Sequence, residues 1–318
     1  MKAFYMPACA LLLLGCNETR EQDSTSTTPT QESSTPAGEQ DPNTISFTKV
    51  KRAPGDVFRD TERMTMNMTS TFTVDGSPPQ ELEISSAKNE IKELTILEAT
   101  AGSISKVQLK VIEKEDTQKT ELVGSKAPAQ EKKETSPLTG KTLLLSRQGG
   151  EIIVTDEAGN PVDEVTREAA LEETDNTFNK DEPGLHMFHK LIPDRPVKLG
   201  ETFNLKGQEA IEILGKDDGT IKEASFSFTL KERVLMENRE YAKFDATMLM
   251  KGGPQTGELV ETSMKGFLLL DTATCWQTQH KWNGTVTMEA SGEIPQGTIV
   301  SKGTGTMTME MEATYSKK

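Results

Sequence analysis

Cysteine, positive charge and long apolar runs are all scarce in this sequence. Three cysteines in 318 residues exclude a small scaffold held together by disulfides. The 36 Lys and Arg residues face 50 Asp and Glu, which leaves a formal net charge of −14. Such an excess of negative charge repels phosphates, so we exclude nucleic acid as a partner and attribute the acidity to solubility. The apolar run at residues 3–14 is too short to span a bilayer.

That apolar run instead has the form of a secretion signal. Met1-Lys2 supplies a positive start, and the run ends in the residues LLGC, with Cys16 last. This ending resembles the bacterial lipobox, in which a peptidase cuts before a cysteine that carries diacylglycerol. The resemblance implies that residues 1–15 are removed and that acylation of Cys16, with fatty acids such as palmitate, anchors the chain to a bilayer of the cell envelope. Asn17 implies, by the same resemblance, the outer membrane in a cell with two membranes.

The segment after the lipobox has the composition of a tether. Residues 17–44 are mainly Ser, Thr, Gln, Glu, Asp and Pro, with Ala37 as the only aliphatic side chain. Such a segment buries too little apolar surface to fold. We predict that residues 16–45 form a lipidated, disordered tether with an average reach of about 30 Å. The folded body is expected to begin near Phe47, and Cys275 is its only thiol.

The body is predicted to be mainly β. In residues 58–74 apolar and polar side chains alternate, which is the period of a half-buried strand. The residues DGSPP at 75–79 then indicate a turn. Further strands are predicted at residues 80–99, 103–115, 141–147, 150–156, 224–235, 240–251, 258–271, 275–291 and 298–316. Residues 124–137 lack core side chains and are predicted to form a long exposed loop.

Two β-rich halves, residues 46–160 and 196–318, are expected on either side of a helical connector at 161–195. In the connector, Val162, Val165 and Ala169 approximate helical spacing. Residues 54–58 (PGDVF) resemble residues 199–203 (LGETF), and residues 140–145 resemble residues 265–270. These matches suggest a duplication, and coincidence is the alternative. The predicted fold class is mainly β (α+β), with long curved antiparallel strands.

Asn283-Gly284 is a common hairpin sequence, but the parity of its neighbours argues against a hairpin. A two-residue turn there would place the apolar side chains of the two arms on opposite faces of the sheet. In one continuous strand, Trp282 and Met288 share a face. We therefore predict one long strand over residues 275–291, with a bulge or bend at Asn283-Gly284.

Several polar arrangements resemble sites but lack the ligands or the spacing that a site needs. His186 and His189 share a helical face with Glu182, but zinc needs three or four ligands and His280 is remote in sequence. Cys275 and His280 fall on opposite faces of a strand, about 16 Å apart, so Cys275 is expected to be a buried structural thiol. The acidic turns at residues 156–160 and 217–219 lack the spacing of a calcium loop. We predict no catalytic residue, metal site or cofactor.

The methionines form the most suggestive pattern. Nine of the 14 alternate within predicted strands. Methionine is flexible and polarisable, which suits adaptable apolar surfaces. The candidate apolar ligand face consists of Met64, Met66, Met68, Met307, Met309 and Met311. We predict that part of it borders an apolar cavity open to solvent. The alternative is a plain core, because apolar stripes at the strand period usually reflect packing.

One short element resembles a known group of proteins. The residues are Pro196-Val197-x-x-Gly200-Glu201-x-Phe203. A similar element lies within a β-rich domain of unknown function in a group of uncharacterised bacterial lipoproteins. This resemblance covers the layout of residues 47–318 and implies neither an enzymatic activity nor functional residues. The long curved strands also resemble, in layout alone, the half-barrel carriers that move lipids or lipoproteins through the cell envelope.

These observations favour a membrane-anchored, non-enzymatic envelope lipoprotein that binds an apolar ligand or a protein partner on a curved sheet. A structural or surface lipoprotein is one alternative. An envelope hydrolase, with site residues distant in sequence, is another. Whether the methionines line an open cavity or a closed core distinguishes the first hypothesis from the others.

Overall fold

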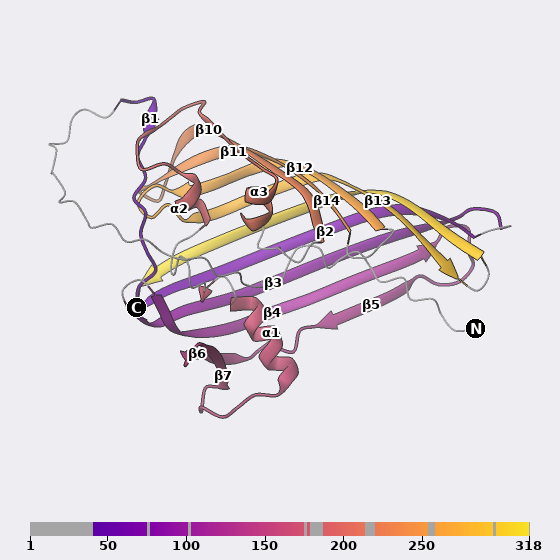
Figure 1. Cartoon of the computed structure of the whole chain (residues 1–318), viewed down its shortest axis with the longest axis horizontal. Coiled ribbons are helices and arrows are strands. Elements are labelled where there is room, and N and C mark those ends of the chain that lie inside the picture. Colours follow the sequence, from indigo (N-terminus) through magenta and orange to yellow (C-terminus); the bar gives the residue numbers. More distant parts are fainter. Residues whose placement is uncertain are drawn as a thin grey trace.

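The structure is a computed structural model that describes residues 41–317, except residues 75–76, 101–102, 175–176, 179–186, 214–219, 254–257 and 295–296. The predicted secretion signal, Cys16 and most of the predicted tether lie outside the described residues. One long, curved antiparallel sheet dominates the molecule (Figure 1). The expectation of a mainly β protein with long antiparallel strands is therefore confirmed.

The elements are long strands, several much shorter strands and short helices. The strands are β1 (Thr44–Ile45), β2 (Asp56–Val74), β3 (Gln80–Thr100), β4 (Ser103–Leu122), β5 (Gln130–Thr135), β6 (Thr142–Gln148), β7 (Glu151–Asp156), β8 (Val197–Lys198), β9 (Thr202–Lys206), β10 (Ile221–Met236), β11 (Arg239–Gly252), β12 (Glu258–Asp271), β13 (Gln277–Ile294) and β14 (Gly297–Lys317). The helices are α1 (Glu164–Thr174), α2 (Met187–Leu191) and α3 (Gln208–Ile213).

The strand order of the large sheet is β7-β6-β4-β3-β2-β14-β13-β12-β11-β10-β9, with β5 paired to β4. Each half of the chain is thus a meander, and the two meanders advance in the same direction across the sheet. The last strand, β14, pairs along nearly its whole length with the first long strand, β2. The two halves expected from the sequence therefore share one sheet, with α1 and α2 in the segment between them.

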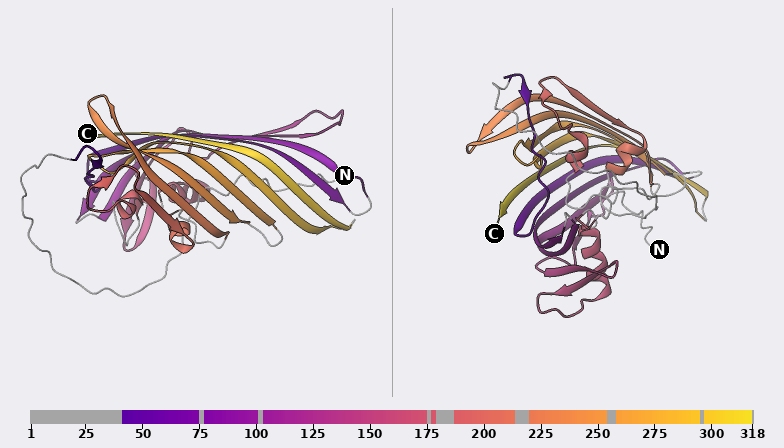
Figure 2. Two further views of the ribbon diagram at one scale, coloured as in Figure 1. Left: turned by 90° about the horizontal axis from the view of Figure 1, so that it is seen from above. Right: turned by 60° about the vertical axis from the view of Figure 1, so that its left-hand side comes forward.

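The sheet curls around the helices, and we call the face that it turns toward them the inner face (Figure 2). Part of the curl is explained by glycines that step diagonally across β12, β13 and β14. A Cβ atom added to Gly266, Gly284 or Gly305 would lie 1.9, 2.0 or 2.3 Å from a backbone oxygen of the neighbouring strand. Because only glycine tolerates so close an approach, these positions let the strands bend toward the inner face.

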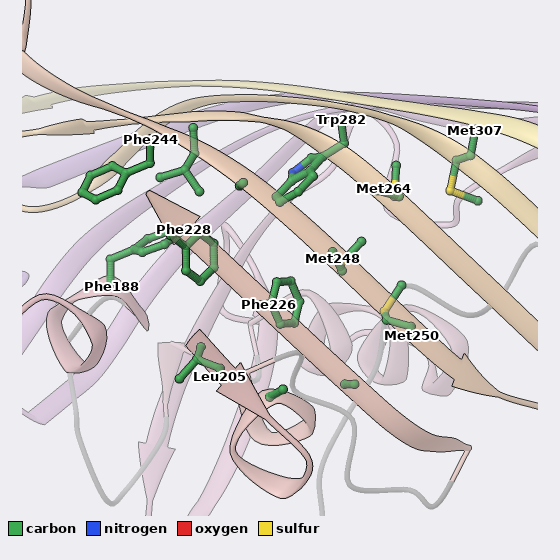
Figure 3. Close-up of a cluster of buried hydrophobic side chains, with 14 of the residues drawn as sticks. Phe188, Leu205, Phe226, Phe228, Phe244, Met248, Met250, Met264, Trp282 and Met307 are labelled. Carbon is green, nitrogen blue, oxygen red and sulfur yellow. The ribbon is translucent and has the colours of Figure 1, made fainter. Parts of the chain in front are cut away.

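Two hydrophobic clusters fill the inner face. The larger one joins α2 and α3 to β9–β14 and β2, with the Phe188 ring edge-on to Phe228 (Figure 3). The smaller one packs α1 against β3, β4, β6 and β7. Phe47 contacts the larger cluster, and Ile45 belongs to it with 1% of its surface exposed. Ile45 had been assigned to the tether, so the ordered body begins slightly earlier than Phe47.

Two further predictions can be compared with the strand register. Residues 277–294 form one strand, in which Asn283 and Gly284 pair with neighbours on both sides, so the hairpin is absent as predicted. The register shift falls elsewhere: Leu269 pairs with Gln279 and Leu270 with Gln277, so Thr278 of β13 is the extra residue. The predicted loop at residues 124–137 was partly wrong. Residues 130–135 form β5, a fully exposed strand that pairs with β4 and contributes nothing to the core.

Candidate functional site

The side chains on the inner face change from apolar to charged along a single cross-strand row. Directly paired residues of antiparallel strands lie on the same face, so the register shows which side chains are neighbours. From β10 to β4 the row reads Leu230, Phe244, Leu268, His280, Met311, Glu62, Glu90 and Lys114. It therefore passes from aliphatic and aromatic side chains, through methionine, to charge.

The six methionines singled out from the sequence are brought together, because β2 and β14 are neighbours. We call them the methionine strip: Met64, Met66, Met68, Met307, Met309 and Met311. Met64 pairs with Met309, and Met66 pairs with Met307. Met64, Met66, Met68 and Met307 are 5–8% exposed and belong to the larger core cluster, and Met309 packs against it. Five of the six methionines are thus packed in or against the core, whereas Met311 is half-buried and belongs to neither cluster.

An apolar pocket on the inner face lies between α2 and strands β9–β12, and β13 separates it from the strip. Its volume is about 10 Å³, roughly that of one water molecule, and its lining contains no methionine. The lining residues are Phe188, Leu191, Ile192, Phe203, Phe228, Phe244, Leu268 and Leu270. Single-ligand sites measure about 300–1,000 Å³. This pocket is therefore not the methionine-bordered cavity expected from the sequence.

Next to the methionine strip lies a group of charged side chains that the sequence did not reveal. We call it the charged band: Asp60, Glu62, Lys88, Glu90, Lys92, Lys114 and Glu173. The first six come from β2, β3 and β4, and Glu173 comes from α1. The register places Lys88 beside Met64 and Glu62 beside Met311, so the band and the strip are contiguous on one face.

Glu90 is the centre of the charged band. Its side chain is 2% exposed and meets three lysines, with Nζ to carboxylate oxygen distances of 3.2 Å for Lys88, 2.8 Å for Lys92 and 3.8 Å for Lys114. Glu173, with a side chain 3% exposed, accepts a hydrogen bond of 2.7 Å from Lys92 and another from Lys114. Two buried carboxylates thus share two lysines, and this network fixes the end of α1 against the sheet.

The network shifts the titration of its members in a consistent way. Burial alone would raise the pKa of Glu90, but Lys92 and Lys88 outweigh burial and lower that pKa well below its usual range. Burial likewise acts to lower the pKa of Lys92, whereas Glu90 and Glu173 raise it on balance. The central groups therefore remain charged at neutral pH.

The pKa values of Asp60 and Glu62 shift in the opposite direction to that of Glu90. Burial raises the pKa of Asp60, and Lys92 and Arg52 offset this only in part. Burial also raises the pKa of Glu62, against the opposing effect of Lys88. The inner face thus holds carboxylates of two kinds within one band, one kind held ionised and the other pushed toward its neutral form. Such divergence is common at functional sites, although structural ion networks also produce it.

The described histidines and the thiol of Cys275 lie in surroundings that stabilise the fold. His189 is buried, and its Nε2 lies 3.0 Å from the Thr274 carbonyl oxygen. Cys275 is fully buried near the Phe188 carbonyl, and burial raises the pKa of its thiol to about 12, so it is a structural thiol, as predicted. Burial lowers the pKa of His280 to about 4. His186 and Glu182 lie outside the described residues.

The remaining polar arrangements also have ordinary explanations. In the turn at residues 156–160, the Asp156 carboxylate accepts hydrogen bonds from the backbone and side-chain nitrogens of Asn160. The second acidic turn, residues 217–219, is outside the described residues. Across the described parts of the chain, no group of His, Cys, Asp or Glu has the geometry of a metal site. Within the same parts, no helix combines the length and apolar character needed to cross a membrane.

Comparisons with known proteins add little. No family model matches the chain, and no curated protein sequence matches it. An outer membrane channel from Pseudomonas putida F1 aligns over 83% of this chain and 97% of its own, with 8% identity and a TM-score of 0.24. DynF from the dynemicin biosynthesis pathway of Micromonospora chersina aligns over 85% of this chain and 84% of its own, with 9% identity and a TM-score of 0.15. Scores this low carry no argument about fold or function.

Proposed function

We propose that the protein is a lipid-anchored, non-enzymatic binding protein of the bacterial cell envelope, held at the membrane by Cys16. Its inner sheet face binds an amphiphilic ligand, with the acyl chain on the methionine strip and the polar end at the charged band. The anchor rests on the lipobox resemblance, and outer-membrane sorting rests on Asn17. The ligand rests on the contiguity of strip and band.

The observation that carries the ligand class is the division of one continuous face into apolar and charged parts. Met64 and Lys88 are direct neighbours across β2 and β3, and Met311 and Glu62 are direct neighbours across β14 and β2. An amphiphile has the same division within one molecule. Most of the strip is packed in this structure, so binding requires the methionines to rearrange, which their three rotatable bonds allow.

Glu90 and Glu173 are buried carboxylates that form ion pairs with lysines. Burying ion pairs of this kind often stabilises a fold less than apolar side chains of similar volume would. A sheet that needed only a core would gain by continuing the methionines onto β3 and β4. Retention of the charges is therefore better explained by what they bind than by the stability that they provide.

The test is direct binding to the mature chain from Asn17 onward, which lacks the lipid. Native mass spectrometry will show a copurified amphiphile, and a fluorescent fatty acyl probe will bind. Changing Met66 and Met309 to Glu weakens binding of the probe. Lys302→Met serves as the matched control, because Lys302 is an exposed partner of Glu289 on the same sheet.

The opposite result is equally informative. If the wild-type chain is folded, by circular dichroism and cooperative unfolding, yet neither carries nor binds an acyl probe, then the inner face is a packed core. The ligand proposal would then be dropped in favour of a structural or surface lipoprotein. Membrane attachment is tested separately, by incorporation of labelled palmitate into wild type and its loss in Cys16→Ser.

A further inference from the structure

The hairpin between β10 and β11 presents two apolar side chains at its tip. Leu235 is 74% exposed and Met236 is 41% exposed, and Leu235 is the most exposed large apolar side chain in the described chain. Met236 pairs with Arg239 across a two-residue turn, Glu237-Asn238, in which both residues have positive φ. This is the tight turn that matches the twist of a hairpin, so the tip is a defined projection.

The described chain begins beside this tip. Arg233, two positions before Leu235, donates a hydrogen bond of 2.8 Å from its guanidinium to the Thr44 carbonyl oxygen. Thr44 and Ile45 pair with Lys198 and Val197 and are thereby fixed to the body. Residues 17–40 are the only covalent link from Cys16 to this point, so the membrane anchor is attached at the end of the sheet that carries Leu235 and Met236.

From this placement we infer a second membrane contact: Leu235 and Met236 insert into the bilayer that holds the acyl chains of Cys16. The inference rests on the lipid anchor of the proposed function and is independent of the ligand. We assign a lipid surface to this contact because the anchored end of the chain and the exposed apolar tip of the hairpin lie at the same ends of the strands. Leu199, 38% exposed, hydrogen-bonds through its backbone to Asn43 and adds apolar surface near the same end.

The charge of the hairpin is compatible with an anionic lipid surface, although the protein as a whole is acidic. Residues 231–243 contain four basic and three acidic residues, in a chain whose net charge is −14. All four basic residues are paired with carboxylates. Within the hairpin, Arg233 pairs with Glu240 at 3.2 Å, Lys243 with Glu232 at 2.8 Å and Lys231 with Asp245 at 3.4 Å, and Arg239 pairs with Asp271 of β12 at 3.8 Å. The hairpin is therefore close to neutral, so an anionic lipid surface repels it less than it repels the acidic chain as a whole.

The experiment places an environment-sensitive fluorophore on the full acylated chain, reconstituted in vesicles of phosphatidylethanolamine with a minor fraction of phosphatidylglycerol. Met236→Cys provides the attachment site, because Cys16 is acylated and Cys275 is buried and unreactive. Val300→Cys is the matched control. Val300 is also 41% exposed, but it lies near the start of β14, where the long strands have their opposite ends.

The fluorophore at position 236 is expected to shift to shorter wavelength and to be quenched by nitroxide-labelled lipids, whereas the one at position 300 is not. In addition, the unacylated mature chain loses vesicle affinity by about tenfold when Leu235 and Met236 are both changed to Ser, but not with Val300→Ser. A membrane-bound chain with no response at position 236 overturns the second contact and leaves the anchor intact. Failure of the chain to incorporate palmitate overturns the anchor itself, and the inference with it.

Discussion

Along the strand order, the inner face has an apolar end at β9–β12 and a charged end at β2–β4. The two ends bury opposite kinds of side chain. Across β9–β12 the face is covered by Phe, Leu and Met that pack against α2 and α3, whereas across β2–β4 it carries Glu90 and its lysines. Both ends belong to one sheet and share the same cross-strand rows. The apolar end gains roughly 25 cal/mol for each Å² removed from water, but the charged end must offset the desolvation of its ions. The comparison teaches that inward orientation in this sheet does not require an apolar side chain.

The largest effect is expected at the apolar end. Phe244 is fully buried, with its ring 6.2 Å from Phe47 and 6.5 Å from Phe203. Phe244→Ala is expected to lower the free energy of unfolding by about 3–5 kcal/mol, because it removes packing and leaves a cavity. Urea denaturation followed by tryptophan fluorescence measures it. Leu259→Ala, at a 44% exposed position, is the control and should change stability by about 0.5 kcal/mol or less. Equal effects would contradict the assignment of the core.

At the charged end, Glu90→Gln is expected to cost about 3 kcal/mol of stability, because Lys88, Lys92 and Lys114 each lose one buried anionic partner and Glu173 still faces only two of them. The control is Glu289→Gln, which breaks an exposed ion pair with Lys302 of 2.9 Å and should cost at most about 1 kcal/mol. Chemical denaturation of both variants gives the comparison. If Glu90→Gln is as mild as the control, the charged band is solvated and the contrast between the two ends disappears.

A combined replacement sharpens the same contrast. Changing Lys88, Glu90, Lys92, Lys114 and Glu173 together to Met would extend the apolar surface onto β3 and β4. Because both buried carboxylates and the three lysines that pair with them are removed together, stability is expected to return to within about 1 kcal/mol of wild type or above it. Binding of an acyl probe with a charged head group is expected to fall. Unchanged probe binding in a stable variant would remove the band from the proposed site.

The boundary between the two ends is sensitive to a single methyl group. Gly284→Ala on β13 would place a Cβ atom 2.0 Å from the Ser263 carbonyl oxygen, so the strands must separate. We expect a loss of about 1–3 kcal/mol. Gly292→Ala, on the same strand, meets nothing nearer than 3.9 Å and serves as the control. Thermal unfolding of the two variants tests whether the curl of the sheet depends on glycine at the boundary.

The smallest expected effect is a dependence on pH. The raised pKa values of Asp60 and Glu62 mean that the folded chain binds protons more tightly there than the unfolded chain does, so their contribution to stability rises as pH falls from 7 through those values. The lowered pKa of Glu90 gives stability that is present above its unfolded pKa and is lost as pH falls through its folded pKa. Stability should therefore peak in mild acid.

The net charge of −14 gives the whole chain a similar trend, so the informative quantity is a difference between variants. In Asp60→Asn combined with Glu62→Gln, the gain in stability between neutral and mildly acidic pH should be smaller than in wild type. Urea midpoints measured across this range provide the comparison. An identical pH profile in the variant would show that these two carboxyls titrate as they do in the unfolded chain.

The long strands were predictable because their side chains alternate over many residues. The predicted bounds of β12, residues 258–271, agree with the structure, and the parity argument identified β13 as one strand. Short elements such as β8, β9 and α3 were missed, since their stability comes from their neighbours and not from a local pattern. Helix α1 was expected from apolar spacing, but Val165 is 64% exposed and the buried face is Thr166, Ala170 and Thr174.

The methionine strip could be found from its residues, whereas the charged band could not. Lys88, Glu90 and Lys92 alternate with Asn89 and Ile91, and a charged parity normally indicates the solvent face. Only the register with β2, which sets Glu90 opposite Glu62 and Lys88 opposite Met64, shows that these charges point inward. One signal was present in the sequence: Asp60 and Glu62 share the parity of Met64, Met66 and Met68.

The pairing of β2 with β14 also has a consequence for folding. Thr65 and Thr308 share a hydrogen bond of 2.6 Å although 243 positions separate them in the chain. Until the C-terminal residues are available, β2 presents a 19-residue open edge, and the two meanders are not joined. Long-range closure of this kind makes folding slow and exposes an edge on which other chains can pair. We therefore expect a chain truncated before residue 297 to aggregate, and the full chain to depend on protection of β2 until its C-terminal strand has been synthesised.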